Sequence, residues 1–149
     1  LISYLMPEEY FYFVGELRNF SKNEVDEFLK QFEDLFNDEI LGGKKYIRDL
    51  SKGNQKKVGI VAALIGNPKV IVLDEPFANL DPTTQIRLKK IIKNLSQKDD
   101  VTVLVSSHDL QDVTEVSDRI VLLEKGMIIK DIKKTQKTLK DLETYFNKG

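Results

Sequence analysis

The sequence of 149 residues contains no cysteine, and this absence excludes two classes of protein. Without thiols, the chain can form neither a disulfide scaffold nor a thiolate metal site. Its formal net charge is only −1, which gives no electrostatic reason to expect a nucleic-acid partner. The apolar runs fall far short of the roughly 20 residues that cross a bilayer, and the first residues lack a secretory signal. We therefore expect a cytoplasmic location.

The residues that are present favour one globular domain, with 41% hydrophobic and 32% charged side chains. The first twenty residues are rich in aromatic side chains without a clean period, and we expect loop with some helix there. Ser21 and Glu24 form a capping box, and the apolar spacing that follows predicts a helix over residues 21–36. The Gly42-Gly43 pair interrupts this pattern, so we expect the first helical unit to end near residue 48.

From residue 49 the pattern changes to alternating helices and strands. Ser51 is a suitable N-cap for a helix that stops at Asn67-Pro68, and residues 70–73 form a continuous apolar run. Such a run is typical of a strand that is buried on both faces of a parallel sheet. We expect further elements in chain order: a helix ending near residue 95, a strand at 101–105, a β-hairpin formed by 120–123 and 127–132, and a closing helix. The order predicts an α/β layered fold.

An acidic pair, Asp74 and Glu75, follows the apolar strand at 70–73. Ligands of open α/β sheets bind outside the carboxyl ends of the strands. In a phosphoryl-transfer site one carboxylate helps to hold Mg²⁺, while a second can orient or deprotonate the attacking water. A strand that simply ends in two solvated acids would give the same local pattern.

Four other residues are candidates for the same site. His108, the only histidine, follows the next apolar strand, and an imidazole can hydrogen-bond a phosphate oxygen or a water. Ser51 and Gly53 open a helix whose first N–H groups would bind an anion. Asp81 can cap the helix that begins near Thr83. Incidental histidine, ordinary helix capping and a solvated basic helix remain open alternatives for these positions.

The order of four motifs resembles that of the ABC-type ATPases. Residues 50–55 (LSKGNQ) resemble the LSGGQ signature, and residues 70–76 (VIVLDEP) resemble the Walker B motif with its catalytic glutamate. Residues 78–82 (ANLDP) resemble the D-loop, and residues 106–109 (SSHD) resemble the switch-histidine loop. The resemblance implies the C-terminal part of a P-loop NTPase domain. Residues 1–48 would form the helical subdomain, and residues 49–149 would form the C-terminal part of the RecA-like ATPase core.

The resemblance also implies catalytic roles at the acidic pair and the histidine. Asp74 would support Mg²⁺, directly or through water. Glu75 would be the general base or the group that polarises the attacking water, and His108 would contact the γ-phosphate of ATP.

The remaining implied site residues belong to a nucleotide site shared between two subunits. Ser51, Gly53 and Asn54 would bind the γ-phosphate of an ATP held mainly by the partner subunit, and Asp81 would help to connect the two sites of a dimer. The sequence departs from the common signature at Lys52 and Asn54, where a glycine and a glutamine are usual.

Two expected parts of such a site are missing from the sequence. No phosphate-binding loop of the form G-x-x-x-x-G-K-[ST] is present, because Asp38 precedes Gly43-Lys44 where a glycine is needed, and Lys45 follows them. Residues 2–8 resemble the Q-loop segment but hold no glutamine, and Glu8 stands in its place. We therefore expect the C-terminal portion of an ABC ATPase domain, which alone hydrolyses ATP negligibly.

The leading functional prediction is an ATP-binding, ATP-hydrolysing subunit of an ABC transporter on the inner face of the membrane. Its partners would be transmembrane permease subunits and a second ATPase domain, in a homo- or heterodimer without nucleic acid. The short closing helix resembles that of exporters. The alternatives are a soluble ABC-type ATPase acting on DNA or ribosomes, and a non-catalytic dimerising fragment.

Overall fold

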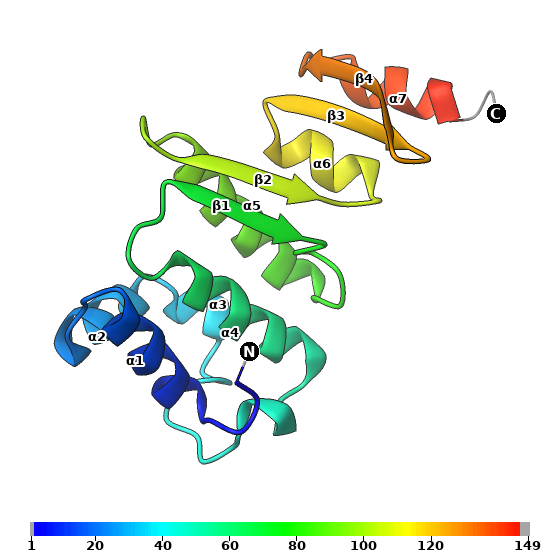
Figure 1. Ribbon diagram of the computed structural model, residues 1–149. Helices are drawn as coiled ribbons and strands as arrows, with labels where there is room; N and C mark the ends of the chain where they lie inside the picture. The colour runs from blue at the N-terminus through cyan, green and yellow to red at the C-terminus, as the bar shows by residue number, and fades with distance from the viewer. Residues whose placement is uncertain (1, 147–149) are drawn as a thin grey trace.

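The computed structural model describes residues 2–146 as a mixed α/β fold in which helices precede a parallel strand pair and a separate hairpin (Figure 1). The elements before the first strand are α1 (Pro7–Leu17), α2 (Lys22–Lys30), α3 (Glu33–Phe36), the 3₁₀ turn η1 (Ile47–Asp49) and α4 (Lys52–Leu64). The elements after it begin with β1 (Val70–Asp74), α5 (Pro82–Ser96), β2 (Thr102–Ser106) and α6 (Leu110–Val116), and end with β3 (Arg119–Glu124), β4 (Met127–Lys133) and α7 (Thr138–Phe146).

Helix α1 occupies most of a stretch for which we expect loop with some helix. Pro7 stands in the first turn, where its missing N–H is not needed, and the Glu9 carboxylate accepts a hydrogen bond from the Met6 N–H at 2.8 Å. Phe11 is fully buried on the inner side of the helix. The helix could not be predicted from the aromatic run, because the aromatic side chains do not all face the core. Phe13, for example, is exposed.

The helix predicted over residues 21–36 is divided in two. Its start is confirmed, because the Ser21 side chain accepts from the Glu24 N–H while the Glu24 carboxylate accepts from the Ser21 N–H. The chain leaves the helical path at Phe32 and resumes as α3. Phe32, Leu35 and Phe36 are all buried in the core.

The parallel pair β1–β2 sets the position of the predicted site. The two strands run in register from Val70 opposite Thr102 to Asp74 opposite Ser106. Parallel strands end at the same edge of a sheet, so the segments that follow Asp74 and Ser106 emerge side by side (Figure 1). Helix α5 begins after Asp81, which accepts from the Thr84 N–H as the predicted N-cap.

Burial of this strand pair differs from the expectation. Ile71 and Leu73 are buried, but Val70 and Val72 are each 65% exposed, and Leu104 of β2 is 62% exposed. The prediction of a strand buried on both faces is therefore wrong for the described chain. The physical reason is that residues 2–146 pack against one face of the pair and leave the other uncovered.

The predicted β-hairpin is confirmed as the antiparallel pair β3–β4, with Glu124 opposite Met127. Lys125 and Gly126 join the strands, and both have positive φ, as a two-residue hairpin turn requires. Among the described residues, no helix is both long and apolar enough to cross a membrane.

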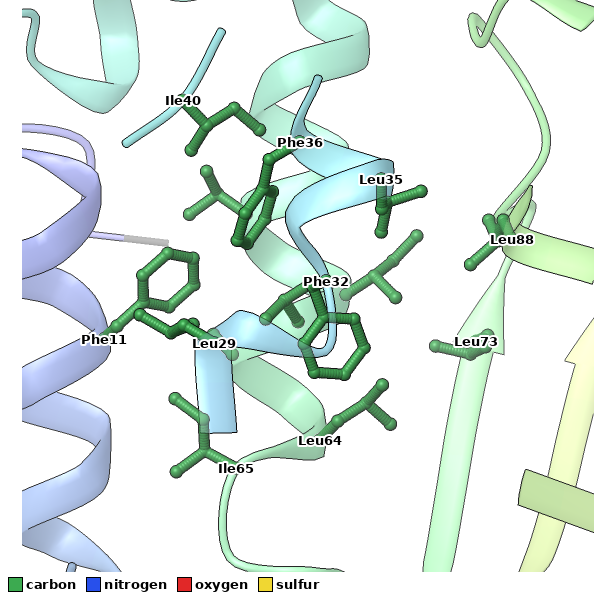
Figure 2. Packing of buried hydrophobic residues seen from close by; sticks show 14 of the residues in the cluster. Phe11, Leu29, Phe32, Leu35, Phe36, Ile40, Leu64, Ile65, Leu73 and Leu88 are labelled. Atoms are coloured by element: carbon green, nitrogen blue, oxygen red, sulfur yellow. The ribbon is translucent and has the colours of Figure 1, made fainter. Parts of the chain in front are cut away.

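One hydrophobic core connects the helices with the strand pair. Figure 2 shows Phe11 of α1 and Phe36 of α3 side by side, with ring centroids 5.8 Å apart. Leu73 of β1 and Leu88 of α5 point from the other side toward the same cluster. The core therefore fixes α4 against both the helical segment and the strand that ends at Asp74.

A close contact between α1 and α2 leads to a stability prediction. A Cβ atom added at Gly15 would lie 2.3 Å from Cγ2 of the fully buried Val25. We expect Gly15→Ala to lower the free energy of unfolding, because overpacking costs about 1–3 kcal/mol. Alanine's better helix propensity offsets at most about 1 kcal/mol of this. Urea unfolding followed by circular dichroism measures the change.

The matched control is Gly43→Ala, because a Cβ atom at Gly43 meets no atom within 4 Å and the residue is not in the left-handed region. Its unfolding free energy should stay within about 0.5 kcal/mol of the parent. A Gly15→Ala protein as stable as the Gly43→Ala protein would contradict the packing described for α1 and α2.

Candidate functional site

The carboxyl ends of β1 and β2 bring two polar side chains into contact. The Ser106 hydroxyl donates a hydrogen bond to the Asp74 carboxylate, as the Asp74–Ser106 register allows. The backbone oxygen of Ser106 accepts from the Glu75 N–H at 3.1 Å. Ser106 lies in the motif at residues 106–109, but the sequence alone assigns it no role. Its register opposite Asp74, obtained by aligning the ends of the two apolar runs, was the signal that could have found it.

Glu75 turns sharply out of the strand and meets His108. Its φ is +44°, in the left-handed region that non-glycine residues rarely adopt. Its Oε1 accepts from the His108 backbone N–H at 3.0 Å and lies 2.8 Å from Nδ1 of the His108 ring. The structure therefore brings Asp74, Glu75 and His108 together at one edge, as the sequence predicts.

The contact with Glu75 changes the acid–base behaviour of His108. The hydrogen bond from the ring to the Glu75 carboxylate, aided by its negative charge, raises the pKa of His108 above its ordinary value. A raised pKa means that the contact stabilises the fold at low pH and that this stabilisation is lost as pH rises through the folded-state pKa. Nδ1 points at Glu75, and within residues 2–146 Nε2 has no hydrogen-bond partner, so Nε2 is available to an external oxygen.

Asp74 fits a magnesium ion only in combination with a phosphate ligand. The described residues contain no group of three or more histidine, cysteine or acidic side chains arranged to hold a metal. Mg²⁺ keeps several waters and is commonly held by one or two carboxylates together with substrate phosphates. The exposed Asp74 carboxylate, with the Ser106 hydroxyl beside it, is a donor set of this kind.

A second group of predicted residues lines a pocket of about 360 Å³ between α4 and the turn before α5. Ser51 caps α4 by accepting from the Asn54 N–H at 3.2 Å, so the first N–H groups of the helix face this region. A Cβ atom on Gly53 would lie 2.9 Å from the Asn79 backbone oxygen. Only glycine therefore allows the start of α4 to approach the Asn79 turn this closely.

Asp81 also lines this pocket, but its carboxylate is engaged locally. It accepts hydrogen bonds from the side chain and backbone N–H of Thr84, and these two bonds lower the pKa of Asp81. Asp81 therefore caps α5, as the helix-capping alternative predicts. Its role in connecting the two sites of a dimer stays a prediction.

Two further residues, Lys57 and Glu39, line the pocket and have no predicted role. Lys57 is only 4% exposed, and its Nζ lies 3.7 Å from Oε2 of Glu39. A hydrogen bond from the Asn54 side chain, together with the Lys57 charge, lowers the pKa of Glu39. From the sequence alone, Lys57 would be taken for a solvated lysine, like its neighbour Lys56. Its helical spacing to the buried Val61 and Leu64 was the signal that placed it on the inner face.

The seven predicted site residues therefore form two groups rather than one. Asp74, Glu75 and His108 meet at the strand edge, whereas Ser51, Gly53, Asn54 and Asp81 surround the pocket. None of the first three residues lines that pocket. Glu8, the residue in place of the Q-loop glutamine, lies in α1 and accepts from the Gly42 N–H at 2.5 Å.

The Glu75–His108 contact gives a prediction that a single resonance can test. We expect Glu75→Gln to lower the pKa of His108 toward the ordinary imidazole value of about 6.5, because the carboxylate charge is removed. His108 is the only histidine, so a proton NMR titration of its ring needs no further assignment. Asp109→Asn is the control, since Asp109 contributes less than Glu75 to the raised pKa and should change it less. Equal shifts in the two variants would contradict the contact.

Comparison with known proteins places this geometry in a family. The sequence family described as "AAA domain, putative AbiEii toxin, Type IV TA system" matches residues 9–111, more than half of the chain. The uncharacterized ABC transporter ATP-binding protein MJ1023 of Methanocaldococcus jannaschii is 35% identical over 119 residues, which are 78% of this chain and 44% of that protein. The methionine import ATP-binding protein MetN of Carboxydothermus hydrogenoformans is 33% identical over 88 residues, which are 59% of this chain and 26% of that protein.

A solved structure gives the same relationship in three dimensions. The dimeric ATP-binding cassette MJ0796, in a post-hydrolysis state bound to ADP and Pi, matches with a TM-score of 0.73 and 26% identity. The match covers 89% of this chain and 58% of that one, and the chain spans less than half the length of the two curated relatives. The chain therefore belongs to this AAA-domain family, has the P-loop NTPase fold of the ABC ATPase domains, and is similar to the ATP-binding proteins of ABC transporters.

Proposed function

We propose that this chain supplies the hydrolytic residues of an ATPase that drives an ABC transporter. The observation that carries the proposal is the contact of Glu75 with His108 beside Asp74, at the carboxyl edge of the parallel strands. Ligands of open α/β sheets bind at this edge. The order of the motifs in the sequence predicts only that they lie near one another. The contact adds that the Glu75 carboxylate and the His108 imidazole share a hydrogen bond.

The two side chains divide the chemistry of hydrolysis. The Glu75 carboxylate orients the attacking water and accepts its proton. The His108 ring, when protonated on both nitrogens, donates from Nε2 to an oxygen of the γ-phosphate. In the structure, His108 contacts Oε1 of Glu75 through its backbone N–H and its ring Nδ1. The carboxylate has a second oxygen, Oε2, which can accept from the attacking water. Mg²⁺, supported by Asp74, would neutralise charge on the phosphates when bound.

The pocket residues act on a different nucleotide. Ser51, Gly53 and Asn54 lie at the start of α4, where the helix dipole and free N–H groups favour an anion. They lie apart from the Glu75–His108 contact, and we infer that they complete the ATP site of a second ATPase domain in a dimer. The dimeric state of the MJ0796 cassette is a property of that protein and supports the inference.

The wider assembly follows from the same proposal. The whole protein would act at the inner face of the membrane with transmembrane permease subunits, and the helical subdomain of residues 1–48 would contact them. Residues 49–149 would form the C-terminal part of the ATPase core. We expect the solute to be exported, and the import in the name of MetN belongs to that relative.

The role of Glu75 predicts a large effect on turnover. In the whole ATPase, which also carries a phosphate-binding loop, Glu75→Gln should lower kcat by about 100-fold or more while nucleotide binding is kept. Steady-state phosphate release and ATP binding are measured on the same preparation. Glu124→Gln is the matched control, because this exposed residue at the end of β3 removes the same charge away from the site. Undiminished turnover in Glu75→Gln would refute the role given to Glu75.

A second prediction concerns the 149-residue chain by itself. The sequence has no phosphate-binding loop, whose backbone N–H groups and lysine would hold the triphosphate. Isothermal titration with Mg-ATP should therefore show no binding in the micromolar range, and phosphate release should stay at the background rate. A micromolar dissociation constant would show that this chain binds the triphosphate by other means.

A further inference from the structure

Lys56 makes a contact that none of the expected site roles explains. It lies on α4 and donates from Nζ to the backbone oxygen of Glu75 at 2.6 Å, in a half-buried position. The two residues are 19 positions apart in the sequence. An ammonium that donates to a carbonyl forms a charge-assisted hydrogen bond, which is stronger than a neutral one. Lys56 therefore acts on the main chain of Glu75, at the point where β1 ends.

Glu75 needs such support because of its backbone conformation. Seven non-glycine residues in the described chain have positive φ, and five of them are asparagine or aspartate, which tolerate this region. The sixth, Lys125, lies in the two-residue turn of the β-hairpin, where positive φ is required. Glu75 is the seventh, and neither its side-chain type nor a hairpin accounts for its φ of +44°. Such a residue persists only where its surroundings hold it.

The contacts of the Glu75 peptide show what holds it. Its N–H donates to Ser106 of β2, and its carbonyl accepts from the Lys56 ammonium and, at 3.3 Å, from the Ala78 N–H. Within residues 2–146, Lys56 forms no ion pair within 4.0 Å with the side chain of Asp74 or Glu75. Its contact with the catalytic segment is therefore made with the backbone and not with a carboxylate.

We propose that Lys56 is a positioning residue, which holds the Glu75 backbone in its left-handed turn and thereby links the signature helix α4 to the carboxylate that meets His108. The link between the signature residues and Glu75 is short. Ser51 is the N-cap of α4, and Lys56 lies five positions later, within the first turns of the same helix. A helix moves as a rigid unit over such a distance. A displacement of the signature end of α4 therefore moves the Lys56 ammonium and with it the Glu75 carbonyl.

This proposal rests on the proposed function for the catalytic meaning of Glu75, but its test needs no nucleotide. Failure of the Glu75→Gln turnover experiment would remove the catalytic role and leave the Lys56 contact intact. Failure of the experiment below would remove the link and leave the catalytic role intact.

The test uses NMR on the 149-residue chain with Lys56→Met, which keeps an unbranched side chain one atom shorter than that of lysine and removes its donor. The one-bond Cα–Hα coupling of Glu75 distinguishes positive from negative φ, and we expect it to move into the range of negative φ. We also expect the pKa of His108 to fall, because a relaxed Glu75 no longer presents its carboxylate to the ring. Removal of the Lys56 charge by itself would raise the pKa of His108, because a cation disfavours protonation of the ring. Loss of the Glu75 contact lowers this pKa, so the two effects are distinguished by the sign of the change.

Two variants serve as controls. Lys56→Arg keeps a cationic donor and should retain both parent values. Lys52→Met removes the same charge from the same helix at a residue that does not contact Glu75, and it should also retain them. Lys56→Leu, which also lacks a donor, replaces Lys56→Met if the latter does not fold. The proposal is overturned if the Glu75 coupling stays at its parent value in the donor-free variant, or if the pKa of His108 stays unchanged or rises.

Discussion

The parallel pairing of β1 with β2 is the constraint on which the rest of the site depends. Because Asp74 stands opposite Ser106, the two strands end at the same level, and the segments after them emerge at one edge. The left-handed turn at Glu75 then directs its carboxylate back to the backbone and ring of His108. A shift of the register by one residue would send these side chains to opposite faces and separate the contacts.

Helix α4 carries the second constraint, because it touches both parts of the molecule. Its first turn, capped by Ser51, forms one wall of the pocket around Ser51, Gly53, Asn54 and Asp81, the signature pocket. One lysine on it, Lys57, is buried beside Glu39 from the helical segment, and its neighbour Lys56 reaches the Glu75 carbonyl. Adjacent residues of a helix point about 100° apart, so two lysines in sequence can serve two different elements. This divergence makes α4 the physical connection between the signature pocket and the hydrolytic edge.

The sequence predicts the strand-end site well because its cause is local and periodic. Apolar runs that end in acids and a histidine place Asp74, Glu75 and His108 at one edge whenever the strands are parallel neighbours. The left-handed turn at Glu75 could not be predicted, since no glycine or asparagine marks it and distant contacts impose it. Lys56 and Lys57 were missed for the same reason: their partners lie in other elements. The exposure of Val72 could not be predicted either, because an apolar strand has the same sequence whether or not a second layer covers it.

The central claim is that the hydrolytic edge and the signature pocket of one chain serve two different ATP molecules. The most direct measurement mixes two inactive forms of the whole ATPase, Ser51→Ala and Glu75→Gln, and follows phosphate release. If the claim holds, a mixed dimer has one doubly altered site and one intact site. Turnover then returns to about a quarter of the parent rate at random mixing, because half of the dimers are mixed and each has one working site of two. If Ser51 and Glu75 served the same site, every mixed dimer would be inactive, and no recovery at any mixing ratio would contradict the account.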